Sequence, residues 1–142
     1  MFKIIESLSL DPIRLPISKT HSFFRPGFIC RIVSDSTSDV CCDLSDGKSV
    51  FGIFGETFNH VTKVADDAYT MYSVPFVNVY TQRMIFRTNE YMFGDYYRGG
   101  SKLYVNNRGL FTAQEPYKDA VYYGRVISPP SYKSQLMEAL FL

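Results

Sequence analysis

The chain has 142 residues, 46% of them hydrophobic and 20% charged, with 15 basic residues, 14 acidic residues and a formal net charge of +1. This composition predicts one folded domain with a sizeable core and excludes a disordered chain. The near-neutral charge argues against nucleic acid as the main partner, because phosphate binding normally requires a basic patch.

Residues 1–26 predict an extended N-terminal arm in front of a β-barrel domain at residues 27–142. Pro12 and Pro16 interrupt any helix, and the apolar residues of the arm partly alternate with polar ones. Such an arm must be buried on its own domain or on a neighbouring molecule, and both arrangements are common. The arm lacks the continuous apolar stretch of a signal peptide, and no run in the chain is long enough to span a membrane. We therefore expect neither a cleaved leader nor a membrane partner.

Short β-prone runs separated by turn clusters fill the rest of the chain. We expect strands at residues 28–33, 40–44, 49–55, 73–82, 83–89, 102–105, 109–112 and 120–128. Residues 56–72 are expected to form a loop with a short helical turn near residues 66–68. Residues 131–142 have a helical composition but close a β chain, and we predict a strand there. The whole pattern predicts an all-β fold, a small barrel or sandwich of short antiparallel strands.

Two turns carry hairpin signals. Asp46 and Gly47 lie between two apolar runs, which predicts a hairpin between strands 40–44 and 49–55. The stretch KLYVNNRGLFT, residues 102–112, could be an anion-binding loop or a hairpin. No helix follows it, so we predict a hairpin in which Gly109 is the left-handed residue of a type I turn with a G1 bulge.

Glycines inside two strands have similar surroundings. Gly52 and Gly124 each follow an aromatic residue and precede β-branched residues. Glycine within a strand marks a bulge or a close approach of another backbone. We expect both glycines to be corners of a barrel.

The cysteines do not indicate a disulfide framework, because there are three of them: Cys30, Cys41 and Cys42. We expect buried, reduced thiols and hence a reducing compartment during folding. A zinc site would need more ligands than His21 and His60 can add. Cys41 with His60 is the one conceivable pairing for a cysteine nucleophile.

The sequence contains none of the standard catalytic or nucleotide-binding motifs, neither GxGxxG before a helix nor GxxxxGK[ST], HExxH or GxSxG. Residues 35–39 only partly resemble a calcium loop. Asp66 and Asp67 with Asp43 could form a carboxylate pair, but acids in turns are usually solvated or capping groups. We therefore predict no catalytic residue, no cofactor and no metal, and expect a protein that is not an enzyme.

Aromatic residues are abundant, with 12 Phe and 11 Tyr, and they suit half-buried surfaces and protein interfaces. Four arginines, Arg83, Arg87, Arg98 and Arg108, lie among them. This mixture is also found in grooves that bind single-stranded nucleic acid. With a net charge near zero, interface and cation–π roles are the preferred interpretation.

The stretches RPGFICRIV, DGKSVFGIFG, GGSKLYVNNRGLFT and YYGRVISPPS follow one another with glycine turns and apolar strands. In this order the chain from about residue 28 onward resembles small β-barrel proteins of tailed-bacteriophage virions, especially capsid decoration (cement) proteins. The resemblance implies a structural role without an active site, with the major capsid protein as partner and the capsid surface of the virion as location. Phage tail and baseplate proteins share similar barrels. The arm and residues 56–72 have no counterpart in the resemblance.

We expect the arm to make the contacts with the capsid. The predicted interface residues are Phe2, Ile4, Ile5, Leu8, Ile13, Phe23, Phe24 and Arg25. The alternatives are a tail, neck or baseplate component, and a small ligand-binding, enzymatic or single-strand nucleic-acid-binding barrel. Contacts between copies of this protein, as a homo-oligomer or on a symmetric lattice, are also expected.

Overall fold

The computed structural model of the chain describes residues 1–7, 11–18, 23–34, 40–59 and 76–142. These residues form antiparallel strands and turns, and no helix is present among them. The predicted all-β class is therefore confirmed. The helical turn expected near residues 66–68 lies outside the described residues.

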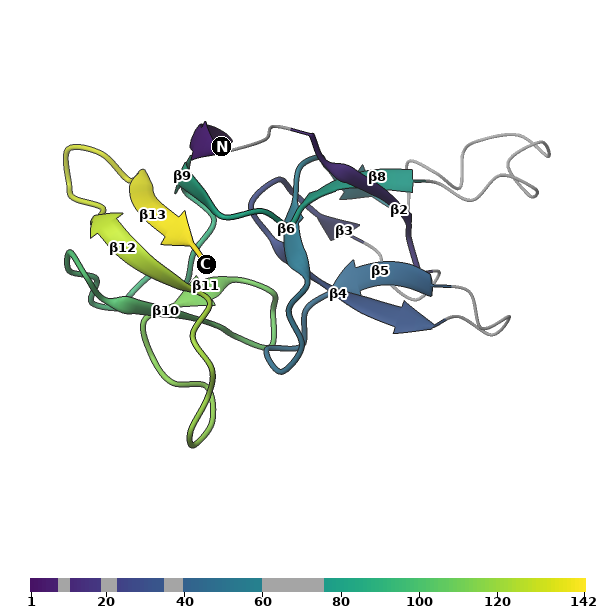
Figure 1. Cartoon of the computed structure of the whole chain (residues 1–142). Helices are drawn as coiled ribbons and strands as arrows, with labels where there is room; N and C mark the ends of the chain where they lie inside the picture. The colour runs from purple at the N-terminus through teal and green to yellow at the C-terminus, as the bar shows by residue number, and fades with distance from the viewer. Residues whose placement is uncertain (8–10, 19–22, 35–39, 60–75) are drawn as a thin grey trace.

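The larger sheet has six strands (Figure 1). In order across this sheet they are β1 (Phe2–Ser7), β9 (Met84–Thr88), β13 (Met137–Phe141), β12 (Gly124–Ser128), β10 (Lys102–Val105) and β11 (Phe111–Thr112). The C-terminal run is thus a strand, as predicted, and lies in the middle of the sheet between β9 and β12.

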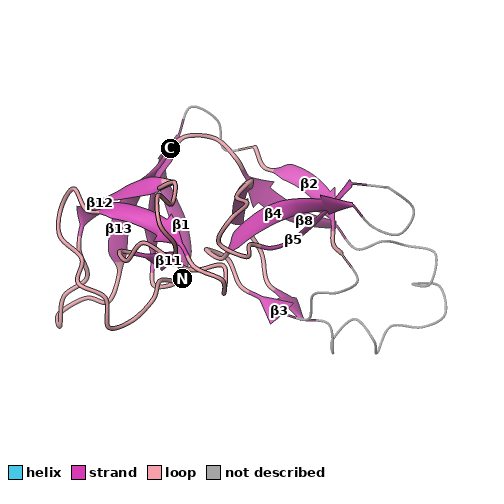
Figure 2. Ribbon diagram, turned by 90° about the horizontal axis from the view of Figure 1, so that it is seen from below, coloured by secondary structure: helices cyan, strands magenta, loops and turns pink. Residues whose placement is uncertain are grey.

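The second sheet has five strands, and a separate pair of short strands lies beside it. In order across the second sheet they are β2 (Ile13–Pro16), β8 (Phe76–Tyr80), β6 (Gly52–Phe54), β4 (Ile29–Ser34) and β5 (Val40–Leu44). The pair consists of β3 (Phe23–Phe24) and β7 (Phe58–Asn59). Figure 2 shows the strands of the two larger sheets as two neighbouring groups, with β3 set apart beneath the second group.

The two sheets form a sandwich-like fold and not a closed barrel. The edge strands of the five-stranded sheet approach each other at one point, where Ile17 forms a single parallel bridge with Cys42 and the Ser18 N–H donates to the Cys42 carbonyl at 2.9 Å. This contact is an isolated bridge and does not close the sheet. Of the two predicted architectures, the sandwich is the one observed.

Strand β6 and the first two residues of β4 are buried on both faces, because a separate core packs against each side of the five-stranded sheet. Ile29 and Ile53 belong to the core shared with the six-stranded sheet, which includes Phe86 and Phe111. The next residue along each of the two strands, Cys30 on β4 and Phe54 on β6, lies in the second core with Val77 and Val79. A strand buried on both faces shows a continuous apolar run instead of alternation.

The N-terminal segment takes part in both sheets. Strand β1 pairs with β9 in the larger sheet, and β2 pairs with β8 in the smaller one. Strands β8 and β9 follow each other in the chain, so residues 2–16 and 76–88 run side by side from one sheet to the other where the structure describes them. The expected extended arm is therefore packed on its own chain along β1 and β2.

The hairpin predicted at Asp46-Gly47 is wrong. Strands β5 and β6 flank β4 on opposite sides and do not pair with each other. The loop between them crosses the end of β4, which takes a partner on each edge. Both β5 and β6 are antiparallel to β4, so they run in the same direction, and the prediction was wrong about both the pairing and the relative direction of the two strands.

The hairpin predicted at residues 102–112 is confirmed. Tyr104 and Val105 pair with Thr112 and Phe111. The Gly109 N–H donates to the Asn106 carbonyl at 3.1 Å, the Asn106 N–H donates to the Leu110 carbonyl at 2.9 Å, and Gly109 has a φ of 72°. These bonds are those of a type I turn followed by a G1 bulge.

The tip of this hairpin joins the two sheets. The Ile29 N–H donates to the Gly109 carbonyl at 2.8 Å. A Cβ on Gly109 would lie 2.6 Å from Leu44 Cδ1, and a Cβ on Gly47 would lie 2.8 Å from the Val105 carbonyl oxygen. Both glycines have positive φ, 72° and 89°. Two glycine turns, one from each sheet, are therefore packed against each other's strands.

Gly52 and Gly124 allow close backbone approach, but they are not corners of a closed barrel. A Cβ on Gly52 would lie 2.5 Å from the Tyr80 carbonyl oxygen, and a Cβ on Gly124 would lie 2.7 Å from the Leu140 carbonyl oxygen. Both positions are inside sheets, where the absence of a side chain lets the neighbouring strand come near.

Candidate protein-interaction surface

The inward side chains of β1 belong to the core. The ring centroid of Phe2 lies 6.1 Å from that of Tyr80 and 5.6 Å from that of Phe86. Ile4 is opposite Phe86 in the strand register and packs against the same core. These two predicted interface residues therefore attach β1 to its own domain.

The outward side chains of β1 are exposed. The strand is at the edge of its sheet, and among the described residues it pairs with β9 alone. A bulge between Ile4 and Glu6 leaves Ile5 without a partner residue on β9, and Ile5 is 40% exposed. Lys3 and Glu6 are exposed on either side of it. An edge strand with a bulge and charged residues is protected against random pairing yet retains a backbone that can accept a specific strand.

Phe23, Phe24 and Arg25 have three different surroundings. Phe24 is fully buried, and its ring stacks on Phe54 with centroids 3.6 Å apart. Phe23 is 41% exposed, and the Arg25 guanidinium lies 5.9 Å from its ring centroid. Arg25 also pairs with the nearly buried carboxylate of Glu90 at 3.0 Å. Phe23 and Arg25 are therefore available at the surface, whereas Phe24 is a core residue.

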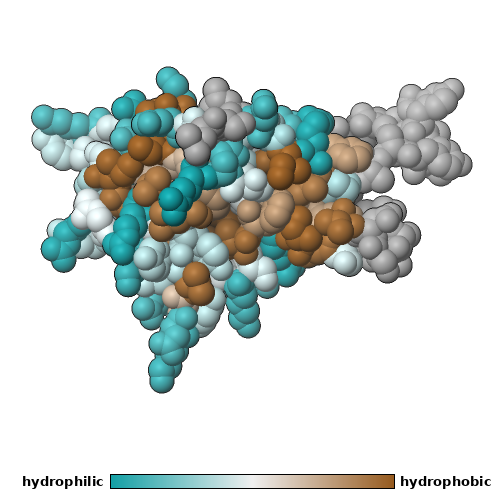
Figure 3. Space-filling view, in the orientation of Figure 1, coloured by the Kyte–Doolittle hydropathy of each residue, from teal (hydrophilic) through white to brown (hydrophobic). Residues whose placement is uncertain are grey.

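Exposed apolar residues continue from the N-terminal segment onto the neighbouring strand β8. Ile13 on β2 is 43% exposed and Phe76 on the neighbouring strand β8 is 49% exposed. Figure 3 shows apolar patches over strands of both sheets on one face, separated by hydrophilic side chains. The remaining predicted interface residue, Leu8, lies outside the described residues. Of the eight predicted residues, Ile5, Ile13, Phe23 and Arg25 are exposed.

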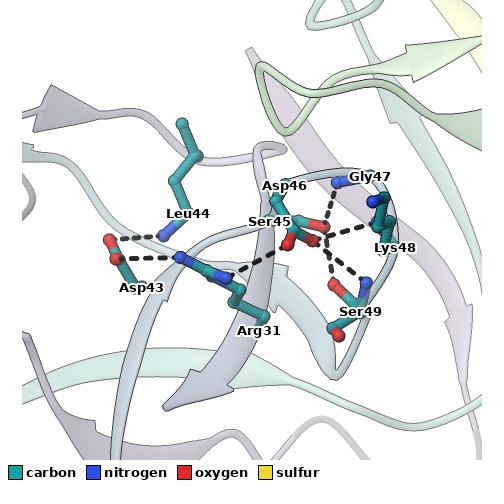
Figure 4. A network of polar contacts seen from close by, with 8 residues as sticks. All are labelled: Arg31, Asp43, Leu44, Ser45, Asp46, Gly47, Lys48 and Ser49. Carbon is teal, nitrogen blue, oxygen red and sulfur yellow. Dashed lines mark hydrogen bonds and ion pairs between the residues drawn. The ribbon is translucent and has the colours of Figure 1, made fainter. Parts of the chain in front are cut away.

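The loop between β5 and β6 is held by its own polar groups (Figure 4). Asp46 Oδ1 accepts hydrogen bonds from the N–H groups of Lys48 and Ser49 at 3.0 and 3.1 Å, and Asp46 Oδ2 contacts Arg31 Nη1 at 3.1 Å. The hydrogen bond from the Lys48 N–H, then that from the Ser49 N–H and the charge of Arg31, hold the pKa of the Asp46 carboxyl below its usual range. Arg31 also reaches Asp43 Oδ2 at 3.7 Å. This polar network fixes the loop, so its acids act as structural groups.

The three cysteines are buried thiols, with Cys30 and Cys42 fully inaccessible and Cys41 3% exposed. Cys30 and Cys42 lie in the core of the smaller sheet. Burial raises the pKa of Cys42 to about 12 and that of Cys30 further still. The Cys41–His60 pairing cannot be evaluated from geometry, because His60 lies outside the described residues.

The folded protein is expected to react slowly with a thiol reagent at neutral pH, since the thiolate is the reactive form and burial disfavours it. All three cysteines should react once the protein is unfolded in denaturant. Stopped-flow labelling with a disulfide reagent measures both rates. Rapid labelling of one cysteine in the folded protein would contradict this expectation and would revive a nucleophilic role for that residue.

Within the described part of the chain, no group of three His, Cys, Asp or Glu residues is placed to hold a metal ion. The candidate calcium residues 35–39, Asp66 and Asp67 lie outside that part. No helix in the described ranges is long and apolar enough to cross a membrane.

Comparison with models of known protein families and with curated protein sequences finds no match for this chain.

One cluster was missed by the sequence-based reasoning. Lys102 meets Tyr122 and Arg125 on the outer face of the larger sheet, although Lys102 is about twenty residues away from them in the chain. Only the pairing of β10 with β12 brings Lys102 opposite Arg125. A strand assignment without register contains no signal for this cluster.

Proposed function

We propose that this protein is a non-enzymatic structural protein of a tailed-bacteriophage virion, a capsid decoration protein that binds and stabilises the lattice of the major capsid protein. The observation that carries the proposal is edge strand β1, whose inward residues are anchored in the core while Lys3, Ile5 and Glu6 are exposed. An extended segment of a neighbouring subunit can add to such an edge through backbone hydrogen bonds.

The exposed apolar residues support the same proposal. Ile5, Ile13 and Phe23 are each at least 40% exposed, and all three are in the N-terminal segment. On a symmetric lattice many copies bind at once, so contacts that are weak individually suffice. Contacts between copies of this protein around the symmetry axes belong to the proposal, as does assembly on the capsid surface after synthesis in the host cytoplasm.

A tail, neck or baseplate component would use the same surface and is the second candidate. Mass spectrometry of intact virions separates the two by copy number relative to the major capsid protein. Decoration requires on the order of hundreds of copies, whereas a ring of cyclic symmetry in the tail has about six or twelve. Complete absence from virions would contradict both candidates.

The apolar contact is tested by Ile5→Glu together with Ile13→Glu. Deleting the N-terminal segment is unsuitable, because Phe2 and Ile4 support the core. We expect the double variant to keep its melting temperature and to bind purified capsids about tenfold or more weakly, since each burial of a large apolar side chain contributes about 1.5–3 kcal/mol. Capsid occupancy in a sedimentation assay measures the effect.

The matched control is Val121→Glu together with Leu142→Glu, two residues with 59% and 43% exposure outside the N-terminal segment. Their change in charge is the same, and their capsid occupancy should remain that of the unmodified protein. Equal loss in both double variants would mean that added negative charge, and not this surface, weakens binding.

A further inference from the structure

A strip of cations and tyrosines lies along strands β10 and β12 and the segments that lead into them, on the side of the larger sheet away from β1. It consists of Tyr96, Arg98, Lys102, Tyr122 and Arg125. Strands β10 and β12, which carry Lys102 and Arg125, are separated from edge strand β1 by β13 and β9. The strip is therefore distinct from the surface proposed above.

Two cations share one ring in this strip. Lys102 Nζ lies 5.1 Å and Arg125 Cζ lies 5.0 Å from the ring centroid of Tyr122. Arg125 is also fixed by its hydrogen bonds, from Nη1 to the Gly100 carbonyl at 3.0 Å and from Nη2 to the Tyr122 hydroxyl at 3.4 Å. Like charges directly opposite each other on neighbouring strands are unfavourable. The cation–π contacts offset part of that repulsion and hold both cations in place.

The third cation is positioned by the turn that leads into β10. The Arg98 guanidinium lies 5.4 Å from the Tyr96 ring, and Tyr96 is 76% exposed. The Ser101 N–H donates to the Arg98 carbonyl at 3.0 Å, and the Gly100 carbonyl within this turn is the one that binds Arg125. Arg98 and Arg125 are thus connected through one short turn.

The acids of the surrounding loops do not neutralise these cations. Among the described residues no carboxylate forms an ion pair with Arg98, Lys102 or Arg125. Glu90 is paired with Arg25, and Asp95 accepts hydrogen bonds from Thr112 and Ala113.

One carboxylate does lie near the strip. Glu115 accepts a hydrogen bond from the Tyr104 hydroxyl at 3.3 Å. Burial and Glu115 raise the pKa of Tyr104, while Arg125 lowers it, so both charges act on the same hydroxyl. Glu115 forms no ion pair with any of the three cations.

We propose that this strip binds an acidic segment of a partner protein, with carboxylates contacting Lys102, Arg125 and Arg98. Guanidinium and ammonium groups that are already held in place bind carboxylates through charge-assisted hydrogen bonds at little ordering cost. Single-stranded nucleic acid fits less well, because bases stack on free ring faces and the Tyr122 ring is already in contact with two cations. The proposal does not depend on the virion function, because it concerns a different surface.

The test is binding of a fluorescent oligoglutamate peptide at low salt, measured by anisotropy on the full chain. Lys102→Ala with Arg125→Ala should weaken binding by about tenfold or more, as expected for the loss of two charge-assisted contacts. Tyr122→Leu should also weaken binding although it removes no charge, because the ring holds both cations. If the double variant is unstable, Lys102→Ala alone still tests the strip, because it leaves the hydrogen bonds of the Arg125 side chain in place.

The matched control is Lys48→Ala with Arg108→Ala, which removes the same charges from exposed residues on the two glycine turns. Unchanged affinity in this control supports the strip. Equal weakening in both double variants, or no binding by the unmodified protein, would overturn the proposal. Tighter binding of an oligothymidylate of equal charge would also overturn it and would assign the strip to nucleic acid.

Discussion

Replacing Gly109 by valine is expected to lower the free energy of unfolding by about 3 kcal/mol. Part of this loss comes from placing a β-branched residue in a left-handed backbone conformation, and part comes from overpacking. The φ of Gly109 is 72°, and a Cβ there would lie 2.6 Å from Leu44 Cδ1 and 3.2 Å from the Ile29 carbonyl oxygen. Leu44 and Ile29 belong to the other sheet, so the substitution pushes the two sheets apart. Urea unfolding followed by circular dichroism measures the change.

Gly94→Val is the matched control for this substitution. Gly94 has a φ of 92°, and a Cβ there would have no neighbour within 4 Å. The control therefore carries only the backbone cost, about 1–2 kcal/mol. If the two variants lose the same stability, the hairpin tip and the smaller sheet are not in close contact in solution.

Phe86→Ala should cause the largest loss among the core residues, about 3–5 kcal/mol. Phe86 is fully buried on β9, and its ring centroid lies 5.6 Å from those of both Phe2 and Phe111. The ring therefore supports β1 on one side and β11, the second strand of the hairpin at residues 102–112, on the other. Besides the loss in unfolding free energy, hydrogen exchange of the β1 amides should become faster, because β1 loses its main inward contact.

Phe93→Ala provides the comparison, since Phe93 is 63% exposed and its truncation leaves no cavity. It should change the unfolding free energy by less than about 0.5 kcal/mol. A similar loss for the two phenylalanines would show that the ring of Phe86 is not packed as described. If hydrogen exchange became faster throughout the molecule, without a larger effect at β1, the substitution would be destabilising the whole fold and not loosening the edge strand specifically.

Much of the fold was predictable because local sequence determines strands and turns. The run at residues 40–44, the hairpin at residues 102–112 and the C-terminal strand are all observed. Gly109 was identified from turn chemistry alone, since a type I turn with a bulge needs a left-handed residue at that position. These features depend on residues that are neighbours in the chain.

The order of strands was not predictable in the same way. The Asp46-Gly47 turn predicted an antiparallel hairpin, whereas β5 and β6 run in the same direction on opposite sides of β4. The relevant information is the burial of both faces at the start of β4, which the sequence shows only as the two consecutive apolar residues Ile29 and Cys30. Sandwich and barrel could not be distinguished either, because closure depends on contacts between distant strands.

The predicted interface residues also depend on information from distant strands. Alternation along residues 2–7 separates inward from outward side chains only when the partner strand is known. Phe2 and Ile4 were therefore grouped with Ile5, although the first two lie against the core. The cluster of Lys102, Tyr122 and Arg125 required the register of β10 on β12 and had no local signal.

The position of β13 has a consequence for the order in which the molecule is built. This strand follows the other strands of the larger sheet in the chain, yet it is paired on both edges in the middle of that sheet. During synthesis β1 and β9 can meet early, but the sheet stays split into two parts until β13 has left the ribosome. Pairing between distant segments makes such β folds slow to form and exposes apolar faces in the interval. The nascent chain is therefore most vulnerable to aggregation just before β13 emerges.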